Sequence, residues 1–324
     1  WHKEPDYLLH MPYISEAANY RLSLEVPQSY EVALGSDETS QKEAAEGRKI
    51  VSSQSSNPLR ELSLAISKDY SVYETKYGNI TVKSYYFKKD KAMAQKAAEF
   101  AIDLMKYYSQ QFGEYPYKQF SIAPVYLGYG GSQNAGIIFL DLRNYEIPKF
   151  LLRYFDFLIA HETGHQWWYN VVGNNEFRQL WLDEGLNSYW MLRYLENKYG
   201  ENAKILEIPP WIEKIVPNPT FKSTRAYRYQ FLAERGLDAP VISALSNFVE
   251  PSMIFSTAYG KGSVVIDMLA HYIGDEKFAR IMKDYFQKYK FQNVTADDFI
   301  KICQDESGKD LNWFFKAWLF GVGA

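Results

Sequence analysis

The stretch that decides the fold is HETGHQWWYNVVGNNEFRQLWLDEGLNSY, residues 161–189. It begins with His161 and His165, and two side chains four positions apart lie on one face of a helix, one turn from each other. Two imidazoles in that arrangement can bind one metal ion. The residue between them, Glu162, can then act as a general base next to the metal. Because HExxH is a short pattern, the prediction depends on finding a third ligand.

A catalytic zinc site has three protein ligands and one open position. The metzincin pattern would place glycine at position 168 and a third histidine at position 171, but Trp168 and Val171 stand there. The Asp183–Glu184 pair lies among apolar residues of the next expected helix, where carboxylates are costly unless they are paired or bind a metal. We therefore predict Glu184 as the third ligand, with Asp183 as the alternative.

The extended motif is HExxH, eighteen further residues and a glutamate within Trp-Leu-Asp-Glu-Gly-Leu-Asn. It resembles the aminopeptidase-N-like gluzincins, a family of zinc metallopeptidases to which leukotriene-A hydrolase also belongs. The resemblance implies one Zn²⁺ per chain and a peptide or protein substrate. It also implies that the zinc ligands are His161, His165 and Glu184. Glu162 is then the catalytic base. Asp183 and Asn187 are the candidates nearest in sequence for holding the ligands in place.

The composition agrees with a globular chain. Of its 324 residues 47% are hydrophobic, and the net charge is −3, with no basic patch that would indicate a nucleic acid partner. No segment has the run of about eighteen apolar residues that a membrane span needs, so no membrane contact is expected within this fragment. We expect a fragment because the chain starts at Trp1 rather than at methionine. The aromatic share of 17% fits either a packed core or a cleft lined with rings.

The pattern predicts an α+β fold with two domains. Residues 1–88 contain alternating stretches typical of strands, with residues 36–57 as a hairpin loop or mobile excursion. They are expected to form the C-terminal part of an all-β domain, a β-sandwich or saddle. Residues 89–324 resemble a thermolysin-like catalytic domain, a small sheet plus helices. The stretches expected as strands are 20–26, 62–66, 80–87, 120–127 and 135–140.

Helical periodicity dominates after residue 89. Residues 207–252 are expected to form short helices and loops around a cleft. The stretch 150–172 is expected as one helix that carries both histidines, and 177–199 as one helix that carries Glu184. Further helices are expected at 91–112, 262–273, 276–289, 296–304 and 311–319.

A glycine-rich segment, Gly130-Gly131-Ser132-Gln133-Asn134, is by itself typical of a turn. It aligns with the family's Gly-x-Met-Glu-Asn motif, an edge strand that binds the substrate backbone and whose glutamate holds the free amino group. The resemblance therefore implies that this segment binds substrate. Gln133 stands at the glutamate position, and an amide can accept a hydrogen bond but carries no charge. An endopeptidase or other amide hydrolase of the same fold is therefore an alternative, as is a non-catalytic peptide-binding module on a zinc scaffold.

The stretch FSTAYGKG, residues 255–262, precedes an apolar helix and matches the family's Tyr-x-Lys-Gly element. By resemblance, Tyr259 is expected to hydrogen-bond the tetrahedral oxyanion. A phenol is a neutral donor at pH 7 that can be aimed at developing negative charge. From the residues alone, a structural tyrosine at a helix start is the alternative.

Overall fold

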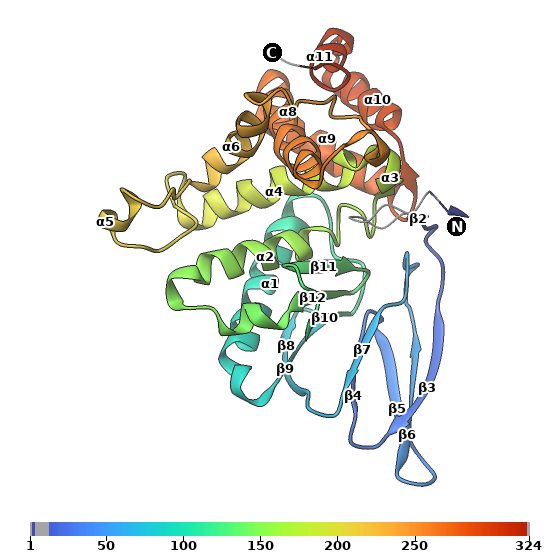
Figure 1. Ribbon diagram of the computed structural model, residues 1–324. Helices are drawn as coiled ribbons and strands as arrows, with labels where there is room; N and C mark the ends of the chain where they lie inside the picture. Colours follow the sequence, from blue (N-terminus) through green and yellow to red (C-terminus); the bar gives the residue numbers. More distant parts are fainter. Residues whose placement is uncertain (1, 4–12, 323–324) are drawn as a thin grey trace. The chain divides into compact units, whose positions relative to one another are not determined.

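The computed structural model describes residues 2–3 and 13–322, which form an α+β fold (Figure 1). The chain divides into two compact units. The sheet unit comprises residues 17–107 and 114–166. The helical unit comprises residues 1–16, 108–113 and 167–324, without the undescribed residues 1, 4–12 and 323–324.

The sheet unit is built on a five-stranded sheet in the order β11-β12-β10-β9-β8. β10 runs parallel to β9 and β12, whereas the outer strands β8 and β11 are antiparallel to their neighbours. A three-stranded antiparallel sheet, β3-β6-β5, and the antiparallel pair β4–β7 complete this unit. The bounds are β3 (Arg21–Pro27), β4 (Glu31–Leu34), β5 (Glu38–Ala44), β6 (Arg48–Gln54), β7 (Leu64–Ser67), β8 (Ser71–Tyr77), β9 (Ile80–Tyr86), β10 (Gln119–Val125), β11 (Gly131–Asn134) and β12 (Ile137–Asp141).

Two long helices belong to this part of the chain. α1 (Lys91–Gln111) buries a stripe of alanines on one face, and α2 (Leu152–Gly164) packs against β11 and β12 (Figure 1). The short 3₁₀ turns are η1 (Lys88–Asp90), η2 (Leu142–Glu146) and η3 (Lys149–Leu151). The contact between α2 and β11 is what places the predicted metal ligands beside the glycine-rich segment.

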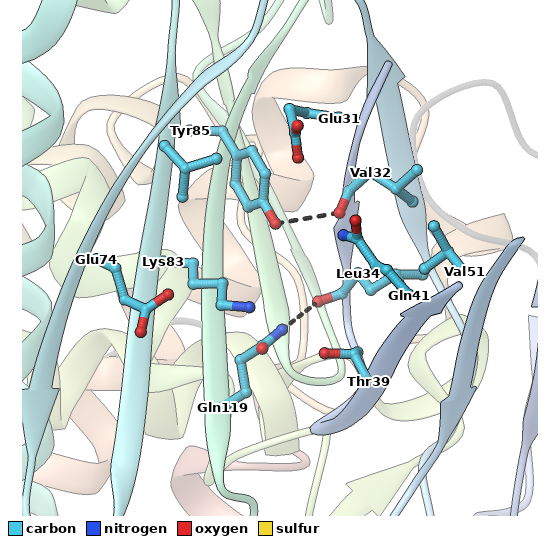
Figure 2. Close-up of a pocket in the computed structure, with 11 residues that line it drawn as sticks. Glu31, Val32, Leu34, Thr39, Gln41, Val51, Glu74, Lys83, Tyr85 and Gln119 are labelled. Carbon is cyan, nitrogen blue, oxygen red and sulfur yellow. Dashed lines mark hydrogen bonds between the residues drawn. The ribbon is translucent and has the colours of Figure 1, made fainter. Parts of the chain in front are cut away.

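Buried polar side chains tie β4 to the five-stranded sheet. Tyr85 Oη donates to the Val32 carbonyl at 3.1 Å, and Gln119 Nε2 donates to the Leu34 carbonyl at 3.5 Å (Figure 2). Both bonds border a small polar cavity of about 190 Å³ between the strands. The β structure of residues 21–86 and the sheet that carries β11 therefore share one packed unit.

The helical unit packs around α4, which is buried along most of its length. Two short strand pairs, β1–β2 and β13–β14, also belong to it. The strands are β1 (His2–Lys3), β2 (Tyr13–Ile14), β13 (Gly173–Asn174) and β14 (Asn293–Val294). The helices are α3 (Glu176–Gln179), α4 (Trp181–Tyr199), α5 (Pro210–Glu213), α6 (Phe221–Ala233), η4 (Leu245–Asn247), α7 (Pro251–Ile254), the π-helix η5 (Phe255–Lys261), α8 (Gly262–Ile273), α9 (Asp275–Tyr289), α10 (Ala296–Ser307) and α11 (Asn312–Trp318).

The aromatic residues of this unit build much of its core. Trp167, Trp168 and Trp181 are buried, and the Phe112 ring packs edge-on against Trp168 and Trp190 with centroid distances of 4.8 and 4.7 Å. Such edge contacts add stability beyond the buried area. The high aromatic content of the chain is therefore accounted for largely by packing.

Two stretches that the residues alone indicated as loop or turn contain strands, and the second of them is the edge strand that the resemblance implies. Residues 36–57 contain the paired strands β5 and β6, joined at a tight turn where Glu46 and Gly47 have φ of 55° and 67°. β5 is almost entirely polar, so its sequence lacks the apolar alternation that signals a strand. Residues 131–134 form the strand β11, and the turn follows it at Gly136, whose φ is +73°.

Two of the expected helices were also wrong in their bounds. The helix with the histidines ends at Gly164, because the chain then turns to bury Trp167 and Trp168, with Tyr169 at a φ of +100°. The next helix is divided into α3 and α4 at Leu180, which keeps helical angles. Neither difference moves the predicted ligands off their helical faces.

Candidate metal centre

The two predicted histidine ligands lie at the C-terminal end of α2. His165 directly follows the last helical residue, and its backbone N–H donates to the His161 carbonyl at 3.4 Å, so the helical spacing continues for one more residue. The two Nε2 atoms are 3.2 Å apart. This matches the separation of about 3.3 Å between two ligand atoms on a tetrahedral zinc ion.

The third predicted ligand, Glu184, lies in the first turn of α4 and is 2% exposed. His161, His165 and Glu184 each offer one ligand atom, and these atoms all lie within 4.8 Å of one another. Asp183, the alternative ligand, is buried but does not belong to this group. Two imidazole nitrogens and one carboxylate oxygen are the donors of a catalytic zinc site with one open position. The residues present therefore fit a zinc ion.

Glu162 lies against the edge strand β11. A Cβ atom on Gly131 would come within 2.7 Å of Glu162 Oε1 and 2.8 Å of its Cγ, and one on Gly130 would come within 2.8 Å of Leu158 Cδ2. Two successive glycines thus let the strand approach α2 closely. Because side chains alternate along a strand, Gln133 faces the same side as Gly131. The buried Glu162 carboxyl and Gln133 are therefore on one side of β11.

Gln133 sits opposite Ile138 of β12 and is 9% exposed. Its amide makes no hydrogen bond to any residue of the part that the structure describes. β12 pairs with one edge of β11, and no strand among the described residues pairs with the other edge. An unpaired strand edge offers backbone N–H and C=O groups to an added extended chain.

Gln166 is a site residue that the sequence analysis missed. It is fully buried, its Nε2 donates to the Asn134 carbonyl at 2.9 Å, and its Oε1 accepts from the Gly136 N–H at 2.9 Å. Ser63, which directly precedes β7, donates from its Oγ to Asn134 Oδ1 at 2.8 Å. Gln166 directly follows His165. Its two hydrogen bonds therefore fix the β11–β12 turn to the segment that carries the histidines. Its position next to a ligand is the one signal for it in the sequence.

Tyr259 is carried by the π-helix η5, and its Oη donates to Glu184 Oε1 at 2.5 Å. π-helical turns are rare and occur frequently at functional sites. Two facing glycines allow this approach. A Cβ atom on Gly185 would lie 3.1 Å from the Ala258 carbonyl oxygen, and one on Gly262 would lie 3.2 Å from the Gly185 Cα. The backbones of α4 and the η5–α8 segment are therefore in contact.

A buried ion pair holds the same π-helix from its other end. Lys261 Nζ donates to Asp238 Oδ1 and Oδ2 at 2.9 and 3.1 Å and to the Ala239 carbonyl at 3.0 Å. Tyr229 Oη on α6 donates to Asp238 Oδ2 at 3.2 Å. Moving Lys261 away from Asp238 would leave two buried charges unpaired, which is costly. The ion pair therefore holds this end of η5 in place.

Asp183 and Asn187 are fully buried on α4, on either side of Glu184 in sequence. A buried carboxylate and a buried amide are groups that can orient ligands. Their role toward the metal remains a prediction.

The loop that leads into β11 is shaped by Asp141. Its carboxylate accepts hydrogen bonds from Arg143 Nε at 2.7 Å and from the backbone N–H groups of Leu127 and Gly128 at 3.1 and 2.8 Å. Its own N–H donates to the Gly130 carbonyl at 3.0 Å. The Arg143 side chain, followed by these backbone donors, holds the pKa of the Asp141 carboxyl well below its usual range. The ionised carboxylate thus stabilises the entry to the edge strand.

Comparison with known proteins extends this picture. A sequence model of the Peptidase family M1 domain matches residues 96–318. The alanine/arginine aminopeptidase of Saccharomyces cerevisiae is 27% identical over 268 residues, which cover 80% of this chain and 30% of the yeast protein. Aminopeptidase N of Lactococcus lactis is 32% identical over 166 residues, 50% of this chain and 18% of that protein. Aminopeptidase B of Rattus norvegicus is 28% identical over 200 residues, 59% of this chain and 28% of the rat protein.

The chain therefore spans less than a third of the length of these curated relatives. Among the helices in the described ranges 2–3 and 13–322, none is both long and apolar enough to cross a membrane.

Proposed function

The chain belongs to peptidase family M1, a family of zinc metallopeptidases, and from this premise we propose that it hydrolyses peptide bonds in the manner of an aminopeptidase. The observation that carries the proposal is the group of His161, His165 and Glu184 on two helices, with Glu162 between the histidines. The spacing and the donor set are those of a catalytic rather than a structural zinc site, since structural sites close all four positions.

The roles of the side chains follow from their chemistry. When bound at this group, zinc supplies a Lewis acid that acidifies a water molecule and polarises the scissile carbonyl. The Glu162 carboxylate accepts the proton of the water and passes it to the leaving amine. The Tyr259 phenol donates a hydrogen bond to the negative oxygen that develops on the carbonyl. Its contact with Glu184 Oε1 supports this role, because it brings the phenol to a metal ligand.

The substrate is proposed to be an extended peptide that adds to the free edge of β11, residues 130–134. Strand addition binds the backbone of any sequence through N–H and C=O groups, and side-chain pockets then supply selectivity. The close packing of Gly131 on Glu162 supports this placement, because a backbone bound at this edge comes next to the proposed base.

The second candidate is an endopeptidase or other amide hydrolase of the same fold. The observation that favours it is Gln133, which is nearly buried on the Glu162 side of β11 and carries no charge for a substrate amino group. A non-catalytic peptide-binding module has less support, because such a module needs neither Glu162 nor Tyr259.

Two further assignments accompany this proposal. Asp183 and Asn187 are proposed to orient the metal ligands. Residues 1–88 are proposed to be the C-terminal part of an all-β domain that contributes β8 and β9 to the sheet of the catalytic domain, residues 89–324. Residues 1 and 4–12 of the first segment lie outside the described part of the chain.

The experiment is a cleavage-product profile of a mixed peptide pool, combined with metal analysis of the wild type, Glu162→Gln and His165→Ala. We expect about one zinc per chain in the wild type and in Glu162→Gln, with nearly all turnover lost in the latter. His165→Ala should lose the metal. A metal-free Glu162→Gln protein or a fully loaded His165→Ala protein would contradict the assignment, and the product profile separates trimming from internal cutting.

A further inference from the structure

A polar cavity lies in the sheet unit, where residues of β4, β5 and β6 face residues of β8, β9 and β10 (Figure 2). Its volume is about 190 Å³. One water molecule needs at least about 10–15 Å³ of such space, whereas sites for drug-sized ligands take about 300–1,000 Å³. The cavity therefore has room for a small molecule of several heavy atoms, but not for an extended peptide.

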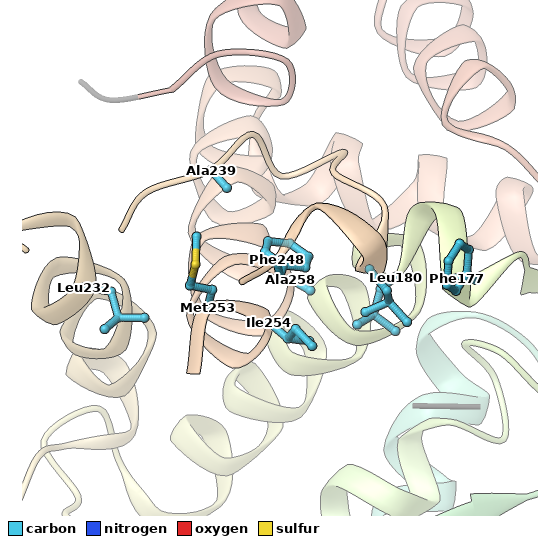
Figure 3. Packing of buried hydrophobic residues seen from close by; sticks show 9 residues of the cluster. Phe177, Leu180, Leu232, Ala239, Phe248, Met253, Ile254 and Ala258 are labelled. Carbon is cyan, nitrogen blue, oxygen red and sulfur yellow. The ribbon is translucent and has the colours of Figure 1, made fainter. Parts of the chain in front are cut away.

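One wall of the cavity is apolar, and the others are polar. Val32, Leu34 and Val51 line it and belong to a buried cluster of the sheet unit. In the helical unit, by contrast, the cluster around Met253 and Ile254 is made of apolar side chains alone (Figure 3). A space with charged and polar walls suits a polar guest, because a buried polar group needs a partner.

The five-stranded sheet contributes two opposite charges to the cavity. Glu74 on β8 and Lys83 on β9 are paired in the strand register, so their side chains lie on the same face of the sheet. In the described ranges 2–3 and 13–322, no residue forms an ion pair or a hydrogen bond with either side chain. The carboxylate and the ammonium group can therefore both bind a group inside the cavity.

The opposite wall adds a balanced charge and two neutral groups. Glu31 on β4 already has a partner, because its Oε1 lies 3.6 Å from Nζ of the buried Lys49. Thr39 and Gln41 lie two positions apart on β5, and both are exposed at the rim of the cavity. The polar ends of Glu31, Thr39 and Lys83 point into the same space (Figure 2). Of the charged groups around the cavity, one carboxylate and one ammonium group are left to recognise a ligand.

We propose that this cavity binds a small zwitterion, a free α-amino acid with a small side chain. Its ammonium group pairs with Glu74 and its carboxylate with Lys83, and such charge-assisted hydrogen bonds are the strong ones. Thr39 and Gln41 supply further hydrogen bonds at the rim. A simple cation or anion would match only one of the two charges. The source of the ligand rests on the proposed function, since an aminopeptidase releases free amino acids, but the binding itself does not depend on it.

The test localises binding to the cavity and does not depend on turnover. Amide hydrogen exchange of the zinc-loaded wild type is followed by mass spectrometry while free L-alanine is titrated in. Alanine should slow exchange in β4, β5 and β9, and its concentration dependence gives the Kd at this site. Alaninamide and N-acetylalanine each lack one of the two charges, so each should bind at least about tenfold more weakly. Triglycine keeps both charges but places them too far apart, and it should give no protection of these strands.

Two substitutions and a matched control complete the test. Lys83→Met and, separately, Glu74→Gln should weaken alanine binding at least about tenfold. Lys42→Met should leave it unchanged, because Lys42 is an exposed lysine of β5 that does not line the cavity.

Two outcomes would overturn the proposal. The first is a cavity that holds only water, so that alanine slows exchange in none of these strands. The second is protection by alanine that both substitutions leave intact. Peptide cleavage by the wild type is measured separately, and protection by alanine without any cleavage would contradict the proposed function while supporting the cavity assignment.

Discussion

The backbone of Gly131 is in direct contact with the carboxyl side chain of Glu162, where a single added methyl group would come 2.7 Å from Oε1 and 2.9 Å from Cδ. This contact connects the edge strand β11 to the proposed base on α2. Glu162 can therefore keep its observed position only because residue 131 has no side chain.

The first prediction is that Gly131→Ala displaces Glu162 and lowers kcat by about 100-fold, because a shift of about 1 Å in a catalytic group can cost that much. Zinc content should remain at the wild-type value, since the three atoms nearest to the added methyl group all belong to Glu162 and none to a histidine. The measurement is kcat with parallel metal analysis. In a Glu162→Gln background, Gly131→Ala should have little further effect, because residues that act together are not additive. An equal loss in both backgrounds would mean that Gly131 acts in some other way.

The second prediction concerns Tyr259, whose hydroxyl contacts Glu184. Tyr259→Phe should lower kcat by about 100-fold or more with little change in KM, as expected for a donor used in the transition state. Tyr272→Phe is the control, because it removes the hydroxyl of an exposed tyrosine on α8, in the same unit. A Tyr259→Phe protein that loses zinc would show that the hydroxyl holds Glu184 in place, and a change of only a few fold would make the tyrosine structural.

The third prediction is a pH dependence of folding that originates at Asp141. The folded-state pKa of this carboxyl lies well below its ordinary value of about 3.9, so its contribution is complete above that value and is lost as the pH falls toward the folded pKa. Asp141→Asn should therefore lower the free energy of unfolding by about 2 kcal/mol at pH 6–7, and by progressively less below about pH 4. Urea denaturation of both proteins across this range measures the difference.

The Asp141→Asn result has a clear contrary outcome. A destabilisation that is the same at pH 3 and pH 7 would mean that the ionised carboxylate makes no special contribution.

The sequence predicted the ligands because their spacing is a local property of helices. His161 and His165 stay one turn apart even though α2 ends at Gly164. The helix α8 was also predicted with its observed bounds, Gly262–Ile273, since its apolar run is long and begins after a recognisable motif. Both results depend on short-range periodicity, which the sequence expresses directly.

The remaining features depend on contacts between segments that are distant along the chain. Gln166 bonds to Asn134 and Gly136, thirty or more residues before it, and no local pattern indicates that pairing. The Gly185–Gly262 contact needs two helices to meet, and the strand β5 is held by pairing with β6 rather than by apolar alternation. The sequence showed which residues carry the chemistry but could not show the packing that positions them.

The last prediction concerns Gln133, on the Glu162 side of β11. A peptide amino terminus has a pKa of about 8 and is mostly charged at pH 7, so an amide in place of a carboxylate leaves that charge only partly compensated. An unpaired buried charge costs about 2–5 kcal/mol, and we expect the lower end because other carboxylates contribute. The wild type should therefore cleave single aminoacyl reporters poorly and blocked or longer peptides comparatively well, and Gln133→Glu should shift the preference toward free amino termini by at least about tenfold.

Kinetics of both proteins on matched free and acetylated peptides decide this question. Acetylation removes the charge of the amino terminus and leaves the backbone contacts on β11. The ratio of the kcat/KM values for the free and the acetylated peptide therefore isolates the contribution of the charged amino group. A wild type that already prefers free amino termini strongly, with little change in Gln133→Glu, would show that the amine site uses another carboxylate. Glu61 is then the residue to test, because its Oε1 accepts from the Ala135 N–H at 2.7 Å, directly beyond the end of β11. In that case Glu61→Gln, and not Gln133→Glu, would change the ratio, and Gln133 would belong to the architecture of an ordinary aminopeptidase.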